Sequence, residues 1–365
     1  MRYSQPLRQV LLLKRAYWNH DRTHPVVRAA FAKVVLCRTP RMGAEVYASE
    51  NEEHTFYHPC KSRTCPSCGH RASVQWRRER WAALPDVAYK GITFTMPDVL
   101  WPLFRDNPHL AKALPALAAK VIAARVRAKH GVRVGVIAIL HTFNGKLEFN
   151  SHVHAMVTAG GVGSRNTWIS SVFHVRDRLM RAWQRAVIKL LRTALRFGHL
   201  RTNMDVEGVN ALLEEEERLW WSIKIQSFKS KEHFLLYAGR YVRRPPIAQR
   251  RITDIGEQTI TFWYKDKKLG RRVDVHCSLE EFIDRWAQHI LQPYQHAVRS
   301  FGLFGPRCLG QTSAAISALL GQKHRPRPRP RRWAESLKRD FGYDPLLDRK
   351  GKRMKWVRRI LPKVS

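Results

Sequence analysis

Acidic residues are scarce in this chain. Among its 365 residues, 29 are Asp or Glu and 66 are Lys or Arg, so the formal net charge is +37. Such an excess of positive charge favours a polyanionic partner, because neutralising phosphates releases their condensed counterions. The composition therefore predicts a nucleic-acid partner. The alternative is a basic surface that serves solubility alone.

Long apolar runs are also absent. The first residues contain only the short apolar block 10–13 before charge returns, and no run of about 18 apolar residues occurs anywhere. A secretory signal needs an apolar stretch of roughly 7–15 residues. We therefore expect neither a membrane span nor a secretory signal. The expected location is the cytoplasm.

Cysteine is sparse, with six in the chain, and four of them lie close together: Cys37, Cys60, Cys65 and Cys68. Two thiolates at a Cys-x-x-Cys spacing can share one tetrahedral ion, and reduced cytosolic thiols more often bind metal than pair. Cys60 adds a third ligand, and Cys37, His54 or His58 is a candidate for the fourth. The alternative is that these cysteines are small buried apolar residues. Four protein ligands would leave no open position, so the predicted zinc site is structural.

Hydrophobic periodicity predicts an α+β fold. β-branched and aromatic stretches indicate strands at 90–97 and 220–228, and a further hairpin within 250–277. Apolar residues at helical spacing indicate helices within 1–30 and at 107–131, 170–198, 231–244 and 278–291. The acidic cluster at 212–220 is interpreted as a solvated helix face. The Arg/Pro-rich stretch that follows residue 321 should stay extended, as a phosphate-binding arm or a linker.

A β-hairpin is predicted from two apolar stretches, 132–143 and 146–161, around Asn144-Gly145. Asn-Gly tolerates the positive φ angles that a tight two-residue turn needs. His152 and His154 lie on the second strand, where alternation places both imidazoles on one face. This pair could form half of a divalent metal site. Alone the pattern is weak, because core or surface histidines are commoner.

Two tyrosines lie four residues apart on the helix predicted at 231–244. Tyr237 and Tyr241 therefore project from one face, with Ala238 and Gly239 between them. The small residues would allow a backbone or a DNA strand to approach closely. Taken alone, a tyrosine pair at this spacing is usually part of a core or an interface.

In combination these features point to one family. The chain resembles the two-tyrosine HUH transposases of rolling-circle insertion sequences, the group that includes the common-region elements, over most of residues 35–305. The matching blocks are CRTPRMG (37–43), CKSRTCPSCGHRASVQW (60–76), GITFTMPDVLWPLF (91–104), LHTF (140–143), NSHVH (150–154) and YAGRYVRRPPI (237–247). One difference is that residues 47–53 lack the additional Cys-x-x-Cys pair of many relatives. A second zinc ion is therefore expected only if His54 or His58 contributes a ligand.

The resemblance implies a zinc-binding module before an RRM-like nuclease core, with an antiparallel sheet flanked by helices, and a basic helical C-terminal region. The expected segments are an N-terminal helical segment 1–30, a zinc-binding domain 31–85, a nuclease core 86–250, a hairpin and helix region 251–320 and a basic Arg/Pro-rich tail 321–365.

The resemblance also implies a bacterial protein associated with the nucleoid, and it implies an activity. Members of the family cut single-stranded DNA at transposon ends and targets, and become joined to its 5′ end through a phosphotyrosine. Here Tyr237 and Tyr241 would be the nucleophiles, and His152 with His154 would hold Mg²⁺ or Mn²⁺. We rank His233, one helical turn before Tyr237, slightly ahead of three other candidates for the third ligand: His141, Glu148 and Gln226. The arginines expected to contact DNA are Arg63, Arg71, Arg77, Arg78, Arg240, Arg243 and Arg244.

Two other functions fit part of the pattern. A plasmid rolling-circle replication initiator or a relaxase would share the metal and tyrosine site, but the zinc segment and the YAGRYVRRPPI block favour the transposase. A non-catalytic zinc-containing DNA-binding protein would need neither His152 nor Tyr237 for its function.

Overall fold

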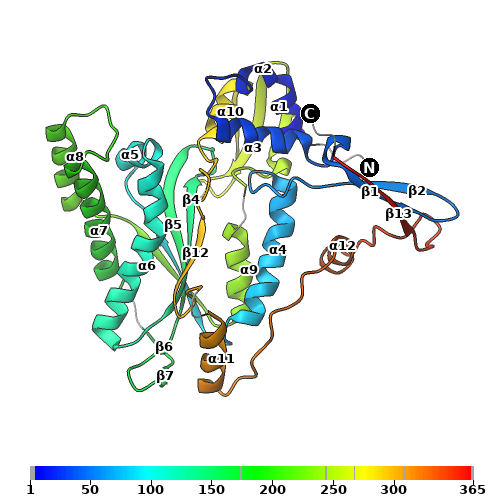
Figure 1. Ribbon diagram of the computed structural model, residues 1–365. Coiled ribbons are helices and arrows are strands. Elements are labelled where there is room, and N and C mark those ends of the chain that lie inside the picture. Colours follow the sequence, from blue (N-terminus) through cyan, green and yellow to red (C-terminus); the bar gives the residue numbers. More distant parts are fainter. Residues whose placement is uncertain (1–4, 173–174, 243–244, 267, 307–308, 363–365) are drawn as a thin grey trace. The chain divides into compact units, whose positions relative to one another are not determined.

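The computed structural model of the protein (Figure 1) describes residues 5–172, 175–242, 245–266, 268–306 and 309–362. The chain forms two compact units. The first combines Met1–Gln75, Arg243–Ile290 and Pro328–Ser365, and the second combines Trp76–Val242 and Leu291–Arg327. None of the described helices is long and apolar enough to cross a membrane. The α+β fold with antiparallel sheets is confirmed.

The second unit is built on a five-stranded antiparallel sheet with the order β12-β4-β5-β3-β8. Its strands are β3 (Tyr89–Phe94), β4 (Gly135–Phe143), β5 (Phe149–Thr158), β8 (Ile223–Phe228) and β12 (Val298–Gly302). A separate two-stranded ribbon joins β6 (Gly161–Val162) to β7 (Trp168–Ile169). The strands predicted at 90–97 and 220–228 are confirmed, whereas β12 has no counterpart among the sequence-based predictions.

Helices cover both faces of this sheet, as Figure 1 shows for α6 and α9. One face packs against η2 (Asp98–Leu100), α5 (Trp101–Arg105), α6 (Pro108–His130), α7 (Arg176–Arg196) and α8 (Val206–Arg218). The other face packs against α9 (Lys231–Val242), the Trp76–Ala83 part of α4 (Pro66–Ala83) and α11 (Leu309–Leu319). Alternation along β3 separates the two cores, because Ile92 and Phe94 join the first and Tyr89 joins the second.

The first unit has two three-stranded antiparallel sheets, β13-β1-β2 and β11-β10-β9. Their strands are β1 (Ala44–Ala48), β2 (Glu53–Tyr57), β9 (Ile252–Ile255), β10 (Thr259–Lys265), β11 (Arg272–Ser278) and β13 (Lys355–Ile360). The helices are α1 (Pro6–Leu13), α2 (Arg15–Trp18), α3 (Pro25–Leu36), η1 (Pro40–Met42), the start of α4, η3 (Gln249–Arg251), α10 (Leu279–Ala287) and α12 (Trp333–Phe341). The Ser278 side chain caps α10 by accepting from the Glu281 amide.

The C-terminal stretch is not uniformly extended, so the prediction was wrong beyond its Arg/Pro-rich part. Residues 323–332 carry no helix or strand, but α12 follows them and β13 pairs with β1. Opposite charges support the pairing, with Arg359 bonded to Glu45 at 2.7 Å and Arg358 to Glu53 at 3.1 Å. Part of the basic charge near the C-terminus therefore neutralises the acidic β1–β2 ribbon.

The predicted hairpin exists, but its turn is not the tight Asn-Gly turn. Phe143 pairs with Phe149, so the loop spans residues 144–148, and a register shift lies between His141 and Phe143. The positive φ in this loop belongs to Leu147, at 63°. A two-residue turn at 144–145 would have placed His141 opposite residue 148. The observed register places it opposite His152, four residues farther along β5.

The close packing of β12 against β4 predicts an unequal cost for two glycine substitutions. Gly302 and Gly131 have similar φ angles, +59° and +65°, but only at Gly302 would a Cβ meet an atom, the Val134 carbonyl oxygen at 2.1 Å. We expect Gly131→Ala to lower the free energy of unfolding by about 1–2 kcal/mol through backbone strain alone. Gly302→Ala should cost about 1–3 kcal/mol more. Urea unfolding of both variants checks this, and equal losses would contradict it.

Candidate functional site

Three histidines converge on the face of the second unit's sheet that α9 covers. His141 comes from β4, and His152 and His154 come from β5. One potential ligand atom from each lies within 4.8 Å of the others. The ring centroids of His152 and His154 are 4.9 Å apart, and that of His141 lies 5.4 Å and 5.0 Å from them. Three imidazoles suit a divalent transition metal, and such a set leaves coordination positions open.

Neighbouring oxygens orient the three rings. The contacts are His141 Nε2 with the Tyr241 carbonyl oxygen at 2.8 Å, His152 Nδ1 with the Asn150 carbonyl oxygen at 2.8 Å, and His154 Nδ1 with Thr93 Oγ1 at 3.2 Å. His141 and His154 are also buried, with 2% and 7% of their surfaces exposed. Partners of this kind select the tautomer and hold the ring of a metal-binding histidine.

Both predicted tyrosines lie on α9 beside this cluster. The Tyr241 ring centroid is 3.9 Å from that of His154, and the two tyrosine rings are 4.9 Å apart. Tyr237 lies farther along the sheet, 4.9 Å from the Phe228 ring. A Cβ at Gly91 would approach the Tyr237 ring to 3.2 Å, so a glycine there makes room for the phenol.

The environment of Tyr237 favours its neutral form. Burial raises the pKa of the Tyr237 phenol well above its usual range, and the adjacent Tyr241 raises this pKa further. The Thr93 hydrogen bond and the charge of Arg240 act in the opposite direction. At neutral pH the phenol is therefore protonated, and any reaction at its oxygen must include loss of that proton.

The third histidine of the cluster is His141, which the sequence interpretation ranked behind His233. His233 is exposed on α9, and its Nδ1 lies 2.8 Å from Ser230 Oγ. It is not part of the cluster that the described residues form. Glu148 lies in the β4–β5 loop, bonded to Asn144 Nδ2 at 2.7 Å, and Gln226 lies on β8. The geometry thus favours His141 as the third ligand. A tight turn at Asn144-Gly145 would have placed His141 several residues from the His152–His154 pair.

The predicted DNA-contacting arginines fall in both units. In the second unit Arg240 is exposed on α9, and Arg77 lies against the same helix, with its Cδ 2.7 Å from the position of a Cβ at Gly239. Arg78 is partly exposed on α4. In the first unit Arg63 and Arg71 are partly exposed, and burial together with the charge of Arg38 lowers the pKa of Arg71. Arg243 and Arg244 lie outside the described residues.

Four cysteines of the first unit form a second cluster. Cys37 follows α3, Cys60 follows β2, and Cys65 and Cys68 lie at the start of α4. The Sγ–Sγ distances are 3.7 Å for Cys37–Cys68 and Cys60–Cys68, and 3.8 Å for Cys65–Cys37. A regular tetrahedron around zinc with Zn–S bonds of about 2.3 Å has edges of about 3.8 Å. The four sulfur atoms therefore fit one zinc ion. Because they fill all four tetrahedral positions, the site is a structural one.

The candidate histidine ligands of this zinc site have other partners. His54 Nε2 lies 3.0 Å from Glu52, and His58 bonds the Met42 carbonyl oxygen and Glu45. Cys37, and neither histidine, completes the set.

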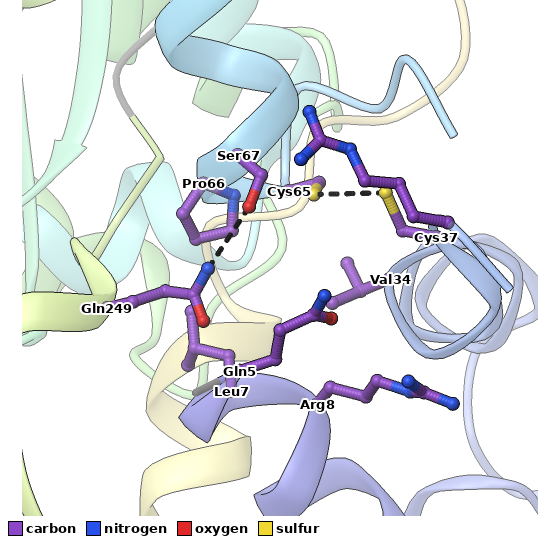
Figure 2. Close-up of a pocket in the computed structure, with 10 residues that line it drawn as sticks. Gln5, Leu7, Arg8, Val34, Cys37, Cys65, Pro66, Ser67 and Gln249 are labelled. Carbon is purple, nitrogen blue, oxygen red and sulfur yellow. Dashed lines mark hydrogen bonds between the residues drawn. The ribbon is translucent and has the colours of Figure 1, made fainter. Parts of the chain in front are cut away.

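A small pocket adjoins the cysteine cluster (Figure 2). Figure 2 shows the Cys65 and Cys37 sulfurs facing each other, and Gln249 donating to Ser67 Oγ at 3.1 Å. The enclosed space is about 10 Å³, which is room for one water molecule. The pocket therefore belongs to the packing around the metal site.

Comparison with known proteins finds a transposase region and a zinc-binding domain in the chain. Residues 135–311 match a family described as putative transposase, and residues 11–96 match a transposase zinc-binding domain. The transposase for insertion sequence element IS801 of Pseudomonas savastanoi pv. phaseolicola is 31% identical over 294 residues, which are 76% of this chain and 70% of the relative. A putative transposase, y4qJ, of Sinorhizobium fredii is 30% identical over 322 residues, 83% of this chain and 80% of the relative. No solved structure matches significantly.

The fold, the zinc-binding module and these matches define a transposase, and thus an enzyme that processes DNA. The chain belongs to the family of the IS801 transposase, in which an IS91-type zinc-binding domain accompanies the putative transposase domain. The resemblance to insertion-sequence transposases with a zinc-binding module is confirmed.

The cysteine geometry predicts which thiols retain the metal. Cys65→Ser should remove one of four ligands and lower the zinc content from about one ion per chain toward zero, with a lower thermal midpoint. Cys277 is also buried but lies outside the cluster, so Cys277→Ser is a matched control that should keep its zinc. Metal analysis of the purified variants by mass spectrometry measures this. Full zinc retention by Cys65→Ser would disprove the assignment.

Proposed function

We propose that this transposase nicks single-stranded DNA at the ends of its element through a 5′-phosphotyrosine and rejoins the strands in rolling-circle transposition. The observation that carries the proposal is the contact between the Tyr241 ring and His154, 3.9 Å between centroids, within a cluster of three histidines. A histidine cluster with only a structural role would not require a helix with two tyrosines beside it. A metal site and nucleophiles on adjoining elements are the two requirements of this reaction.

The chemistry is a transesterification. A tyrosine Oη attacks the phosphorus of one phosphodiester, the bond from phosphorus to O3′ breaks, and the phenol proton is lost while O3′ is protonated. The DNA 5′ end remains joined to the protein, and the reverse attack by a 3′-OH reseals the strand without ATP. A Mg²⁺ or Mn²⁺ ion held by His141, His152 and His154 would polarise the scissile phosphate.

Two tyrosines allow two cleavages without release of the DNA. While one phenol holds a 5′ end, the other is available for a second phosphate. Their rings lie 4.9 Å apart, close enough to serve one metal site in turn. Arg240, exposed between them on α9, is suited to bind a phosphate of the same strand.

The zinc module and the adjoining helix would bind DNA near the cut. The side chains proposed for phosphate contact are Arg63, Arg71, Arg77 and Arg78, with Arg243 and Arg244 following α9. Because the four cysteines enclose the zinc ion completely, this ion would shape the binding surface and take no part in the cleavage.

The tyrosine assignment predicts the loss of covalent adducts. With a single-stranded oligonucleotide of the element end and Mn²⁺, the double variant Tyr237→Phe/Tyr241→Phe should form no adduct but still bind the DNA, since only the nucleophilic oxygens are removed. Tyr294, 87% exposed in the same unit, offers the control Tyr294→Phe, which should form adducts normally. Gel electrophoresis under denaturing conditions detects the adduct. Adduct formation by the double variant would refute the assignment.

The choice between His141 and His233 as the third metal ligand can be tested directly. His141→Gln should reduce Mn²⁺-dependent cleavage about 100-fold, because the metal supplies several kcal/mol to the reaction. His233→Gln changes the same residue type on the tyrosine helix but outside the cluster, and should leave cleavage nearly unchanged. Initial cleavage rates at fixed Mn²⁺ concentration decide the question. The reverse order of effects would restore His233 as the ligand.

A further inference from the structure

Thr93 lies between one histidine of the cluster and one tyrosine. It lies on β3, directly opposite His154 in the antiparallel ladder, and both side chains lie on the face that α9 covers. Its Oγ1 is 3.2 Å from His154 Nδ1, and the same hydroxyl is near enough to the Tyr237 phenol to lower the pKa of that phenol against the effect of burial. A single side chain thus contacts both a metal-binding candidate and a nucleophile candidate.

The protons that each group carries decide which partner donates in these two contacts. A threonine hydroxyl has one proton to donate and two lone pairs to accept with. If His154 offers Nε2 to a metal, its Nδ1 carries the proton and donates to Thr93 Oγ1. The Thr93 proton is then available to the Tyr237 oxygen. That arrangement also stabilises the negative charge that develops on this oxygen when the phenol loses its proton.

Tyr241 has a different connection to the cluster. Its backbone carbonyl oxygen accepts from His141 Nε2 at 2.8 Å, and its ring packs on His154. Its position thus depends on the backbone of α9 and on ring packing. The contacts of the two tyrosines with the cluster therefore differ, although their rings lie 4.9 Å apart, and the Thr93 hydroxyl acts directly on Tyr237.

We propose that Thr93 is a positioning residue that orients His154 for metal binding and holds the Tyr237 phenol for its turn as nucleophile. This inference rests on the proposed function. It adds a difference between the two tyrosines. Loss of the Thr93 hydroxyl should slow the reaction of both tyrosines by weakening metal binding. It should slow the reaction of Tyr237 further, because this phenol also loses its contact with the hydroxyl.

Metal binding gives the first test. The variants are Thr93→Val, which keeps the β-branched shape without the hydroxyl, and Thr93→Ser, which keeps the hydroxyl. The full-length protein with its zinc bound is titrated with Mn²⁺ in a calorimeter. We expect Thr93→Val to weaken Mn²⁺ binding about 10- to 100-fold, as for other outer partners of metal-binding histidines, and Thr93→Ser to restore most of the affinity.

A matched control lies two residues along the chain. Thr95 Oγ1 donates to the Ser222 carbonyl oxygen and contacts neither the histidine cluster nor a tyrosine. Thr95→Val therefore removes a threonine hydroxyl without changing the proposed contacts. It should bind Mn²⁺ like the wild type. Equal Mn²⁺ affinity of Thr93→Val and the wild type would overturn the role toward His154, and so would a Thr93→Ser variant as weak as Thr93→Val.

The adduct rate gives the second test. At saturating Mn²⁺, Thr93→Val should slow adduct formation about fivefold in a Tyr241→Phe background, where only Tyr237 reacts, because one hydrogen bond is lost. In a Tyr237→Phe background the rate should not change. Equal slowing in both backgrounds would overturn the link to Tyr237. If the wild type forms no adduct, the proposed function itself fails, and the calorimetric result still decides the role of Thr93 toward His154.

Discussion

The pairing of β4 with β5 is the constraint on which the candidate site depends. The register places His141 directly opposite His152, and alternation along β5 brings His154 to the same face. A shift of one residue would turn the histidines toward the core that α6 and α7 cover. Burial of the apolar α9 side chains Phe234 and Ala238 against the site's face of the sheet then sets Tyr241 beside His154.

Local patterns predicted much of this arrangement. Alternation in residues 146–161 indicated the strand with His152 and His154, and helical spacing in 231–244 indicated that Tyr237 and Tyr241 share a face. The Cys65-x-x-Cys68 spacing predicted a metal site. What local patterns could not supply was the register, which the five-residue loop and the irregularity beside His141 determine. The ranking of His233 ahead of His141 followed from assuming the tighter turn that Asn144-Gly145 suggests.

The sequence also could not predict the pairing of strands that lie far apart in the chain. Ala44 pairs with Ile360, although β1 has only five residues and the exposed, basic β13 lacks the alternation that indicates a half-buried strand. Composition led to the interpretation of the C-terminal stretch as an extended arm, since proline and arginine alternate there. The structure shows that a basic segment also finds acidic partners within its own chain, as Arg359 does at Glu45.

The cysteine cluster and the histidine cluster differ as a structural zinc site and the proposed catalytic site should differ. Four thiolates at Sγ–Sγ distances of 3.7–3.8 Å match the complete coordination shell of zinc, so that site can hold structure but admit no phosphate. Three imidazoles leave positions open, and a tyrosine ring lies beside them. A phosphate oxygen can therefore enter only the second site. Soft sulfur ligands select zinc for the first, while imidazole with oxygen from substrate and water suits Mn²⁺ or Mg²⁺ at the second. The ligand type alone thus separates the structural zinc site from the site of the proposed cleavage.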